Sequence, residues 1–179
     1  MAKKILIITS SMRKGSNSDI LARAFTNGAK DAGNEVDTIS LKDKNIKYCN
    51  GCLACQKSGR CILDDDAAEI VEKVQNADVL VFVSPVYYYS ISGQLKTLLD
   101  RMNPLYPLDY KFRYVYLLSV AHENEDTTVK GSVTAIQGWV DCFPKAQLMG
   151  TIFAGGVGKP KEIIGHPALV KAYETGLSI

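Results

Sequence analysis

Four of the five cysteines in this 179-residue chain lie close together in the sequence. Cys49, Cys52, Cys55 and Cys61 fall within 13 residues, and Cys142 lies far from them. In a reducing compartment, clustered cysteines bind metals or carry out redox chemistry more often than they form structural disulfides. A zinc site is one alternative, although such sites usually place a longer insertion between their cysteine pairs. The other alternative is a remnant motif whose thiols are free, oxidised or joined in a disulfide.

A polar loop over residues 10–18, SSMRKGSNS, carries several groups that can bind an anion. The hydrogen-bond donors are the hydroxyls of Ser10, Ser11, Ser16 and Ser18, the amide of Asn17 and the guanidinium of Arg13. Free backbone amides at the start of a following helix would add to them. The loop is neither a G-x-x-x-x-G-K-[ST] motif nor a G-x-G-x-x-G motif. Several donors around one anion suit a monophosphate such as that of FMN; the alternative is an ordinary polar connection with a capping serine.

A second loop, SPVYYYSIS over residues 84–92, combines a stiffening proline with three successive tyrosines. Aromatic and backbone groups at the end of a strand can flank a planar ring and hydrogen bond to its polar edge. The alternative is that Tyr87, Tyr88 and Tyr89 pack against a neighbouring subunit, and both interpretations can hold together.

The elements that position these loops follow from the hydrophobic pattern. Strands are predicted over 3–9, 35–41, 79–84, 112–120 and 147–154. Helices are predicted from 16–18 to 32, from 66 to about 76, and over 93–102, 127–142 and 162–176. This alternation predicts an α/β fold with a parallel sheet and helices on both faces. Ligands of such sheets bind at the carboxyl ends of the strands, which selects the loops 10–18, 84–92 and 119–126. We expect one domain over 1–179, with a cysteine-rich insertion at about 42–65.

The composition excludes several classes of protein. Hydrophobic residues make up 46% and charged residues 22%, and the formal net charge of +2 shows no excess of basic residues for nucleic acid. The apolar runs are too short to cross a membrane, and no signal-peptide pattern follows the first residues, so we expect a cytoplasmic protein. A phosphoacceptor receiver domain is excluded, because the first and third strands end in Thr9-Ser10-Ser11 and Ser84-Pro85 instead of acidic residues.

Three segments, IITSSMRKGSNS (7–18), SPVYYYSISGQLKTLLDRM (84–102) and residues 155–160, resemble the NADPH-dependent FMN reductase family. The similarity is greatest to its iron–sulfur flavoprotein branch, also described as multimeric flavodoxins. The resemblance implies a flavodoxin-like three-layer sandwich with a five-stranded parallel sheet of order 2-1-3-4-5. It also implies tightly but non-covalently bound FMN and assembly as a homodimer or homotetramer.

The resemblance also implies roles for individual residues. The phosphate ligands would be Ser10, Arg13, Ser16, Asn17 and Ser18, and the residues around the flavin ring would be Pro85, Val86, Tyr87, Tyr88, Tyr89 and Ser90. In the third loop it implies Ala121 and Glu123, although relatives often have a glycine-rich turn there. The pattern Cys49-x2-Cys52-x2-Cys55-x5-Cys61 matches the one that holds a [4Fe–4S] cluster in this branch.

The sequence therefore predicts an FMN-dependent oxidoreductase. It would take electrons from NAD(P)H or a reduced carrier and pass them to a small-molecule or protein acceptor. No acid–base residue is predicted, because the flavin would carry the chemistry. The alternatives are a non-enzymatic electron carrier of flavodoxin type and a binding module that has lost its flavin. His122 lies near the predicted flavin edge, where it could influence the protonation of the flavin; the alternative, which we expect, is a surface residue. Cys142 is expected to be a small core residue.

Overall fold

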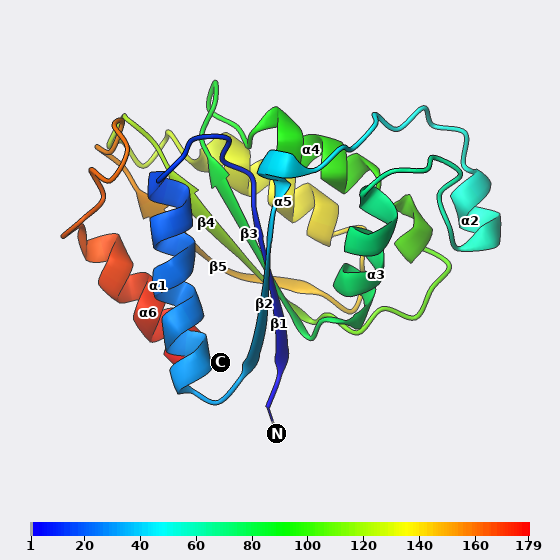
Figure 1. The fold of residues 1–179 in the computed structure, drawn as a ribbon, viewed down its shortest axis with the longest axis horizontal. Helices are drawn as coiled ribbons and strands as arrows, with labels where there is room; N and C mark the ends of the chain where they lie inside the picture. The colour runs from blue at the N-terminus through cyan, green and yellow to red at the C-terminus, as the bar shows by residue number, and fades with distance from the viewer. Residues whose placement is uncertain (1) are drawn as a thin grey trace.

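The computed structural model describes residues 2–179 and contains one parallel sheet of order β2-β1-β3-β4-β5 (Figure 1). The strands are β1 (Lys4–Thr9), β2 (Glu35–Ser40), β3 (Val79–Pro85), β4 (Tyr114–Val120) and β5 (Gln147–Ala154). Each neighbouring pair runs parallel. The predicted fold class and strand order are confirmed.

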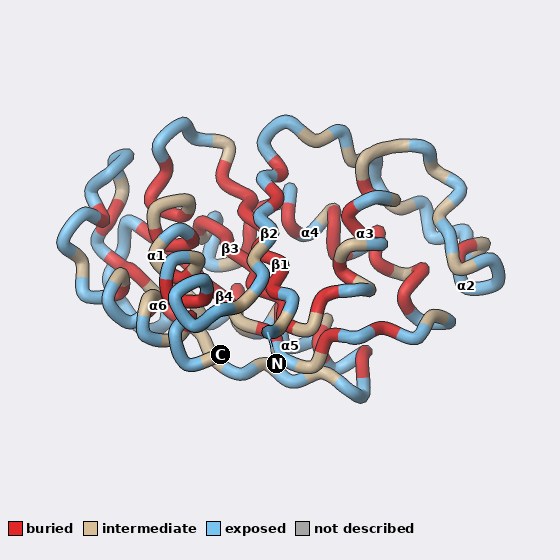
Figure 2. The backbone as a smooth tube through the Cα atoms, turned by 60° about the horizontal axis from the view of Figure 1, so that its bottom comes forward, coloured by how far each residue is buried: buried red, intermediate tan, exposed pale blue. Residues whose placement is uncertain are grey.

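Helices cover both faces of this sheet (Figure 1). Their bounds are α1 (Asn17–Asp31), α2 (Ala54–Ser58), α3 (Ala67–Asn76), α4 (Gly93–Asp100), α5 (Lys130–Val140) and α6 (Pro167–Leu177). Side chains alternate along a strand, so Ile5 and Ile7 of β1 pack with α1 and α6 on one face. Leu6 and Ile8 pack with α3, α4 and α5 on the other. Figure 2 shows the buried strands at the centre of the molecule.

Helices α1 and α6 pack more closely than ordinary side chains would allow. A Cβ atom added to Gly28 would lie 1.9 Å from the carbonyl oxygen of Tyr173, and one added to Gly176 would lie 2.2 Å from that of Phe25. Glycine at both positions lets the two backbones approach each other. This contact fixes α1, whose first turn faces the strand ends.

The last helix begins later than the sequence pattern predicts, at Pro167 instead of residue 162. The preceding residues form a turn in which the Glu162 carboxylate accepts hydrogen bonds from the backbone N–H groups of Gly158 and Lys159. Proline is well suited to the first position of a helix, and the His166 side chain caps it by accepting from Ala168 N–H. The prediction missed this boundary because the turn depends on a local carboxylate contact.

Residues 42–66 form an irregular segment apart from the end of a 3₁₀ turn (Leu41–Asp43) and the short helix α2. Within this segment Cys55 is the one buried residue, and α2 lies at the periphery of the molecule (Figures 1 and 2). The predicted single domain with an insertion here stays a prediction. Among the residues that the structure describes, none of the helices has both the length and the apolar character to span a membrane.

Candidate functional site

A cleft of about 250 Å³ opens at the carboxyl ends of β1, β3 and β4. Its lining comes from the three loops selected by the sequence and from the loop after β5. The lining residues are Ser11, Arg13, Ser16, Asn17, Ser18, Pro85, Val86, Tyr87, Val120, Ala121, His122, Val157 and Gly158. The volume is somewhat below that of most small-molecule pockets, so a ligand here would be only partly enclosed.

The first turn of α1 provides the part of the cleft best suited to an anion. Ser16 is the N-cap, and its hydroxyl oxygen accepts a hydrogen bond from Asp19 N–H at 3.0 Å. The Ser18 hydroxyl is buried and has no hydrogen-bond partner among the described residues. A buried hydroxyl without a partner costs free energy, and a bound acceptor would remove that cost. The helix dipole and the unpaired N–H groups of this turn favour the same negatively charged ligand.

Arg13 and Asn17 line the cleft, and both also connect the loop over residues 10–18 to residues 157–163. The Arg13 guanidinium donates to the carbonyl oxygen of Gly158 at 2.8 Å. The Asn17 amide donates to the carbonyl oxygens of Val157 and Lys159, at 3.2 and 2.8 Å, and accepts from Ile163 N–H at 3.3 Å. Both amide hydrogens of Asn17 are thus used inside the protein. In this structure Asn17 shapes the cleft, and Arg13 keeps further N–H groups for a ligand.

Ser10 lies behind the cleft and is not among its lining residues in the described part of the chain. The Ser10 hydroxyl is buried, donates to the carbonyl oxygen of Val83 at 3.1 Å and accepts from the Ser92 hydroxyl at 2.8 Å. Ser10 therefore joins β1, β3 and the start of α4, and its predicted contact with phosphate stays a prediction.

The structure divides the six predicted ring contacts into two groups. Pro85, Val86 and Tyr87 line the cleft. Tyr88, Tyr89 and Ser90 lie outside its lining, because the chain reverses here in a tight turn closed by hydrogen bonds between Tyr87 and Ser90. Tyr88 and Tyr89 both have left-handed backbones, with φ of 49° and 62°, and Tyr88 is fully exposed. Left-handed conformations are costly for residues other than glycine, so the surrounding structure must hold this turn in place.

Two contacts hold this turn, residues 87–90 and here called the tyrosine turn, against the third loop and against α5. Hydrogen bonding to Glu123, together with its negative charge, raises the pKa of Tyr89. The carbonyl oxygen of Tyr89 lies so close to α5 that a Cβ added to Gly131 would be 2.1 Å from it. Glycine at position 131 is what allows this approach.

In the third loop Ala121 lines the cleft and Glu123 does not, and cofactor binding by either residue stays a prediction. The Glu123 carboxylate instead accepts from the Thr128 hydroxyl at 3.3 Å and faces Tyr89. His122, which is exposed as expected, also lines the cleft. It packs so tightly against Gly158 that a Cβ there would lie 2.6 Å from its Nδ1 atom.

Sequence reasoning assigned no role to three of the lining residues: Val120, Val157 and Gly158. Ser11 was expected only as one of the hydroxyl donors of the first loop, and His122 only as a neighbour of the flavin. Val120 directly precedes the predicted Ala121. Val157 and Gly158 lie in the stretch 155–160 that resembles the family, but no site was predicted there.

The four clustered cysteines all have free thiols. Burial raises the pKa of Cys55, and the charges of Cys61, Cys52 and Cys49 raise it further. Within residues 2–179, however, no three side chains of His, Cys, Asp or Glu are already arranged to hold a metal ion. The donor set fits a thiolate-bound metal chemically, and the backbone of the segment would have to close around it.

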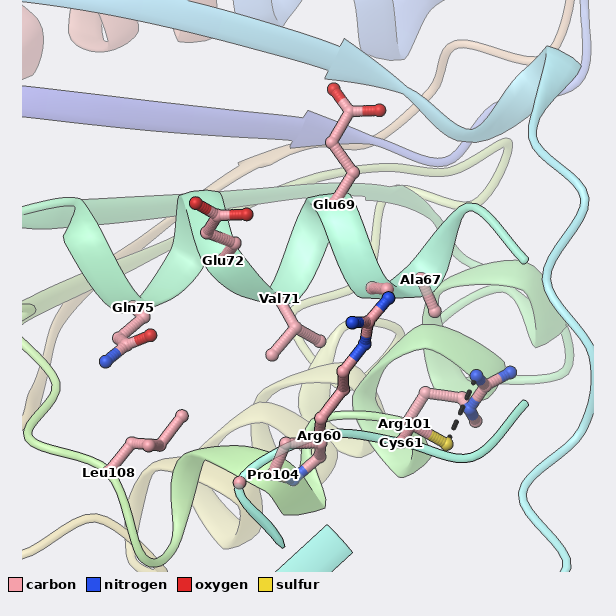
Figure 3. A pocket seen from close by; sticks show the side chains of 12 residues that line it. Arg60, Cys61, Ala67, Glu69, Val71, Glu72, Gln75, Arg101, Pro104 and Leu108 are labelled. Atoms are coloured by element: carbon pink, nitrogen blue, oxygen red, sulfur yellow. Dashed lines mark hydrogen bonds between the residues drawn. The ribbon is translucent and has the colours of Figure 1, made fainter. Parts of the chain in front are cut away.

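A larger cavity, of about 450 Å³, lies beside this segment and away from the strand ends. Figure 3 shows it between the outer surface of α3 and the residues Arg60, Pro104 and Leu108. Arg101 and Cys61 lie at one end, with the Arg101 guanidinium donating to the Cys61 sulfur (Figure 3).

Cys142 is exposed, so the prediction that it lies in the core is wrong. It comes just after the last residue of α5, where its thiol donates to the carbonyl oxygen of Gly138. The helical pattern predicts which residues of a helix face the core, but it does not predict the orientation of residues beyond the end of the helix.

Comparison with known proteins adds three findings. A family model described as NADPH-dependent FMN reductase matches residues 3–137. An iron–sulfur flavoprotein of Methanocaldococcus jannaschii is 40% identical over 102 residues, covering 57% of this chain and 53% of the relative. The chain spans about half the length of the iron–sulfur flavoproteins that it matches.

Solved structures of two enzymes resemble the fold. An NAD(P)H:quinone oxidoreductase from Methanothermobacter marburgensis has a TM-score of 0.73 at 17% identity, over 99% of this chain and 97% of that one. An azoreductase from Bacillus anthracis has a TM-score of 0.75 at 20% identity and matches over 100% of both chains. At this identity the likeness supports the fold alone.

Proposed function

The chain belongs to the NADPH-dependent FMN reductase family, and we propose that it binds FMN in the strand-end cleft and works as an NAD(P)H-dependent oxidoreductase. The observation that carries this proposal is the Ser18 hydroxyl. It is buried, unpartnered among the described residues, and placed at the helix start where a phosphate would bind. Family membership supports flavin chemistry, and the cleft supports the position of the cofactor.

At the phosphate end, the residues of this chain would bind and orient the ligand. The Ser18 hydroxyl would donate to a phosphate oxygen, and the Ser16 hydroxyl, which accepts from Asp19, still has its hydrogen to donate. Arg13 would add positive charge from the cleft edge, where its contact with Gly158 already holds it. Hydrogen bonds to a charged acceptor such as phosphate are stronger than those between neutral groups.

At the other end, Pro85, Val86 and Tyr87 form a wall that would contact one side of the ring. Val86 N–H is bonded to the carbonyl oxygen of Val120 at 2.9 Å, which fixes this wall to the neighbouring strand. When bound, FMN supplies the ability to accept a hydride and to release electrons singly or in pairs. The contribution of the chain is therefore to hold and orient the ring and to leave one side open to the electron donor.

A Ser18→Ala variant tests the phosphate contact. We expect it to bind FMN about tenfold or more weakly, since a hydrogen bond to a charged group contributes roughly 1.5–3 kcal/mol. Riboflavin, which lacks the phosphate, should bind both proteins equally. Ser132→Ala is the matched control, because the Ser132 hydroxyl is also buried and unpartnered among the described residues but lies on α5, outside the cleft lining. Equal FMN affinity in the Ser18 variant and the wild type would contradict the proposed position.

Electron transfer is tested by anaerobic titration of the FMN-loaded protein with NADH and NADPH. Bleaching of the flavin by either nucleotide supports the oxidoreductase. Reduction only by a protein donor would instead support an electron carrier of flavodoxin type. A quinone, a nitro compound, oxygen, free flavin or a protein could then be compared as the acceptor of the electrons.

We further propose that Cys49, Cys52, Cys55 and Cys61 bind a [4Fe–4S] cluster. The support is the spacing of the four thiols in the sequence and the iron–sulfur flavoproteins among the relatives. Iron and acid-labile sulfide measured on anaerobically purified protein test this, with Cys142→Ala as a control that should keep full iron content.

Assembly as a homodimer or homotetramer is also proposed, because the fully exposed Tyr88 stands at the tip of the tyrosine turn. Sedimentation of the wild type and of Tyr88→Ser would test it. A monomer in the wild type would refute it.

A further inference from the structure

Arg101 is a charged residue in the interior of the protein. Only 1% of its surface is exposed, and its guanidinium is paired with the Asp65 carboxylate at 2.6 Å (Nη1–Oδ2) and 3.0 Å (Nη2–Oδ1). Both side chains are fully buried. A buried ion pair is often no more stabilising than well-packed apolar residues, so stability alone does not explain it.

The other hydrogen bonds of the Arg101 guanidinium all go to residues 42–66, the segment that carries the four clustered cysteines. The guanidinium donates to the carbonyl oxygen of Lys47 at 2.7 Å, to that of Leu63 at 3.4 Å and to the Cys61 sulfur at 3.4 Å. Lys47 precedes the first cysteine of the cluster, and Leu63 follows the last. One side chain therefore joins the two ends of the segment. It also contacts the fourth thiol, as Figure 3 shows.

Other hydrogen bonds also join the two ends of the cysteine segment (residues 42–66). Asp66 N–H donates to the carbonyl oxygen of Asn45 at 3.1 Å, Asn45 N–H donates to the Asp66 carboxylate at 2.6 Å, and the Lys47 ammonium donates to the carbonyl oxygen of Asp64 at 3.0 Å. Between these ends, over residues 48–63, Cys55 is the one buried residue, and Gly51, Leu53 and Gly59 have left-handed backbones. Such a segment cannot be fixed by a core of its own, because few apolar side chains leave water. The Asp65 carboxylate also accepts from Lys47 N–H at 2.8 Å, so the ends of the segment meet at the buried ion pair.

Arg101 also connects this segment to the strand-end cleft. It directly follows α4, an eight-residue helix about 12 Å long. At the other end of α4 the cap residue Ser92 donates to the Ser10 hydroxyl at 2.8 Å, and its N–H donates to the Ser84 hydroxyl at 2.9 Å. Helix α4 is thus tied at its start to the strands that form the cleft and at its end to the cysteine segment.

We propose that Arg101 is a positioning residue: it closes the cysteine segment at its two ends and sets the place of Cys61 relative to the other thiols and to the cleft. The function of this positioning, to arrange the cluster ligands, rests on the proposed iron–sulfur site. The planar fork of arginine is essential, because it reaches the carboxylate, two carbonyl oxygens and the sulfur at once. A lysine would keep the charge but could not make this set of bonds.

The test compares Arg101→Lys with Lys96→Met, a control that removes a charge from the exposed Lys96–Asp100 pair on the same helix. Metal-free protein is treated with iodoacetamide, and the alkylation rate of each cysteine is followed by peptide mass spectrometry. We expect Cys61 to react about tenfold faster in Arg101→Lys, because losing bonds of the fork opens the segment more often. Cys142, which is already exposed, should react at an unchanged rate in both variants.

A second readout is the reconstituted protein. Arg101→Lys should take up less iron and sulfide and show a weakened cluster spectrum, while its FMN affinity stays that of the wild type. Unchanged FMN affinity shows that the fold is intact. If Arg101→Lys does not fold, Asp65→Asn removes the charge that anchors the guanidinium and should also speed the alkylation of Cys61.

The two proposals fail in different ways. A wild-type protein that binds no iron overturns the cluster, and the alkylation rates alone then decide whether Arg101 positions the segment. A Cys61 rate equal to that of the wild type in both Arg101→Lys and Asp65→Asn overturns the positioning role, whatever the iron content.

Discussion

Replacing Gly131 by alanine should weaken FMN binding from outside the cleft. Gly131 lies in the first turn of α5 and faces the tyrosine turn. An added Cβ would lie 2.1 Å from the carbonyl oxygen of Tyr89, whereas ordinary contact begins at 3.4 Å. The two atoms must therefore separate by about 1.3 Å, the difference of these distances. Because the close atom belongs to the backbone, no side-chain rotation can relieve the contact.

The size of the effect follows from two opposing terms. Overpacking of this kind costs roughly 1–3 kcal/mol. Alanine gains up to about 1 kcal/mol over glycine in a helix, and less in its first turn. We therefore expect a net loss of about 1–2 kcal/mol in the free energy of unfolding. Tyr88 and Tyr89 are already strained, so the turn cannot absorb the shift and passes it to Tyr87 in the cleft wall.

The assay is a fluorescence titration of FMN together with urea unfolding of the flavin-free protein. If the displacement of Tyr87 reduces the free energy of FMN binding by about 1.4 kcal/mol, the affinity for FMN falls about tenfold. Gly138→Ala on the same helix is the control, because nothing lies within 4 Å of its added Cβ. That variant should be more stable by about 0.5–1 kcal/mol and bind FMN as the wild type does. Wild-type affinity in Gly131→Ala would refute the reasoning.

Three further predictions concern other parts of the molecule. Gly28→Ala should lower the free energy of unfolding by about 3 kcal/mol, since its Cβ would lie 1.9 Å from the Tyr173 carbonyl oxygen, and urea unfolding measures this. Although burial opposes ionisation, hydrogen bonds from Arg101 and from backbone amides lower the pKa of Asp65. Because the pKa is lower in the folded protein than the value of about 3.9 in the unfolded chain, the ionised carboxylate stabilises the fold at pH values above about 4. The difference in free energy of unfolding between the wild type and Asp65→Asn should therefore shrink as the pH falls below about 4. Asn17→Ala loses three hydrogen bonds to the loop after β5 and should weaken FMN binding in the same titration, whereas unchanged binding would show that this loop holds its place alone.

Much of the architecture was readable from local pattern. Continuous β-branched runs such as residues 5–8 and 79–83 predict strands buried on both faces, and their alternation with helical periods leads to a parallel sheet. Because parallel strands place their carboxyl ends along one edge, the loops at 10–18, 84–92 and 119–126 could be expected to meet. The cleft formed by residues of all three confirms this.

The sequence could not show which of many suitable side chains are free to bind a ligand. Ser10, Ser16 and Ser18 are chemically alike and lie in one loop. Their hydrogen bonds differ, because the Ser10 hydroxyl is bonded to Val83 and Ser92, whereas the Ser18 hydroxyl has no hydrogen-bond partner among the described residues. Such hydrogen bonds join residues far apart in the chain, and residue type and spacing do not record them.

The sequence by itself determined the sheet, the edge where the three loops form a cleft, and the presence of four thiols in one segment. Only the tertiary structure decided where that segment lies. Asp65 and Arg101 are 36 positions apart, and no local periodicity links them. Burial brings them together, since a charge removed from water must find an opposite charge, and that pairing ties the cysteines to the helix that begins at the cleft.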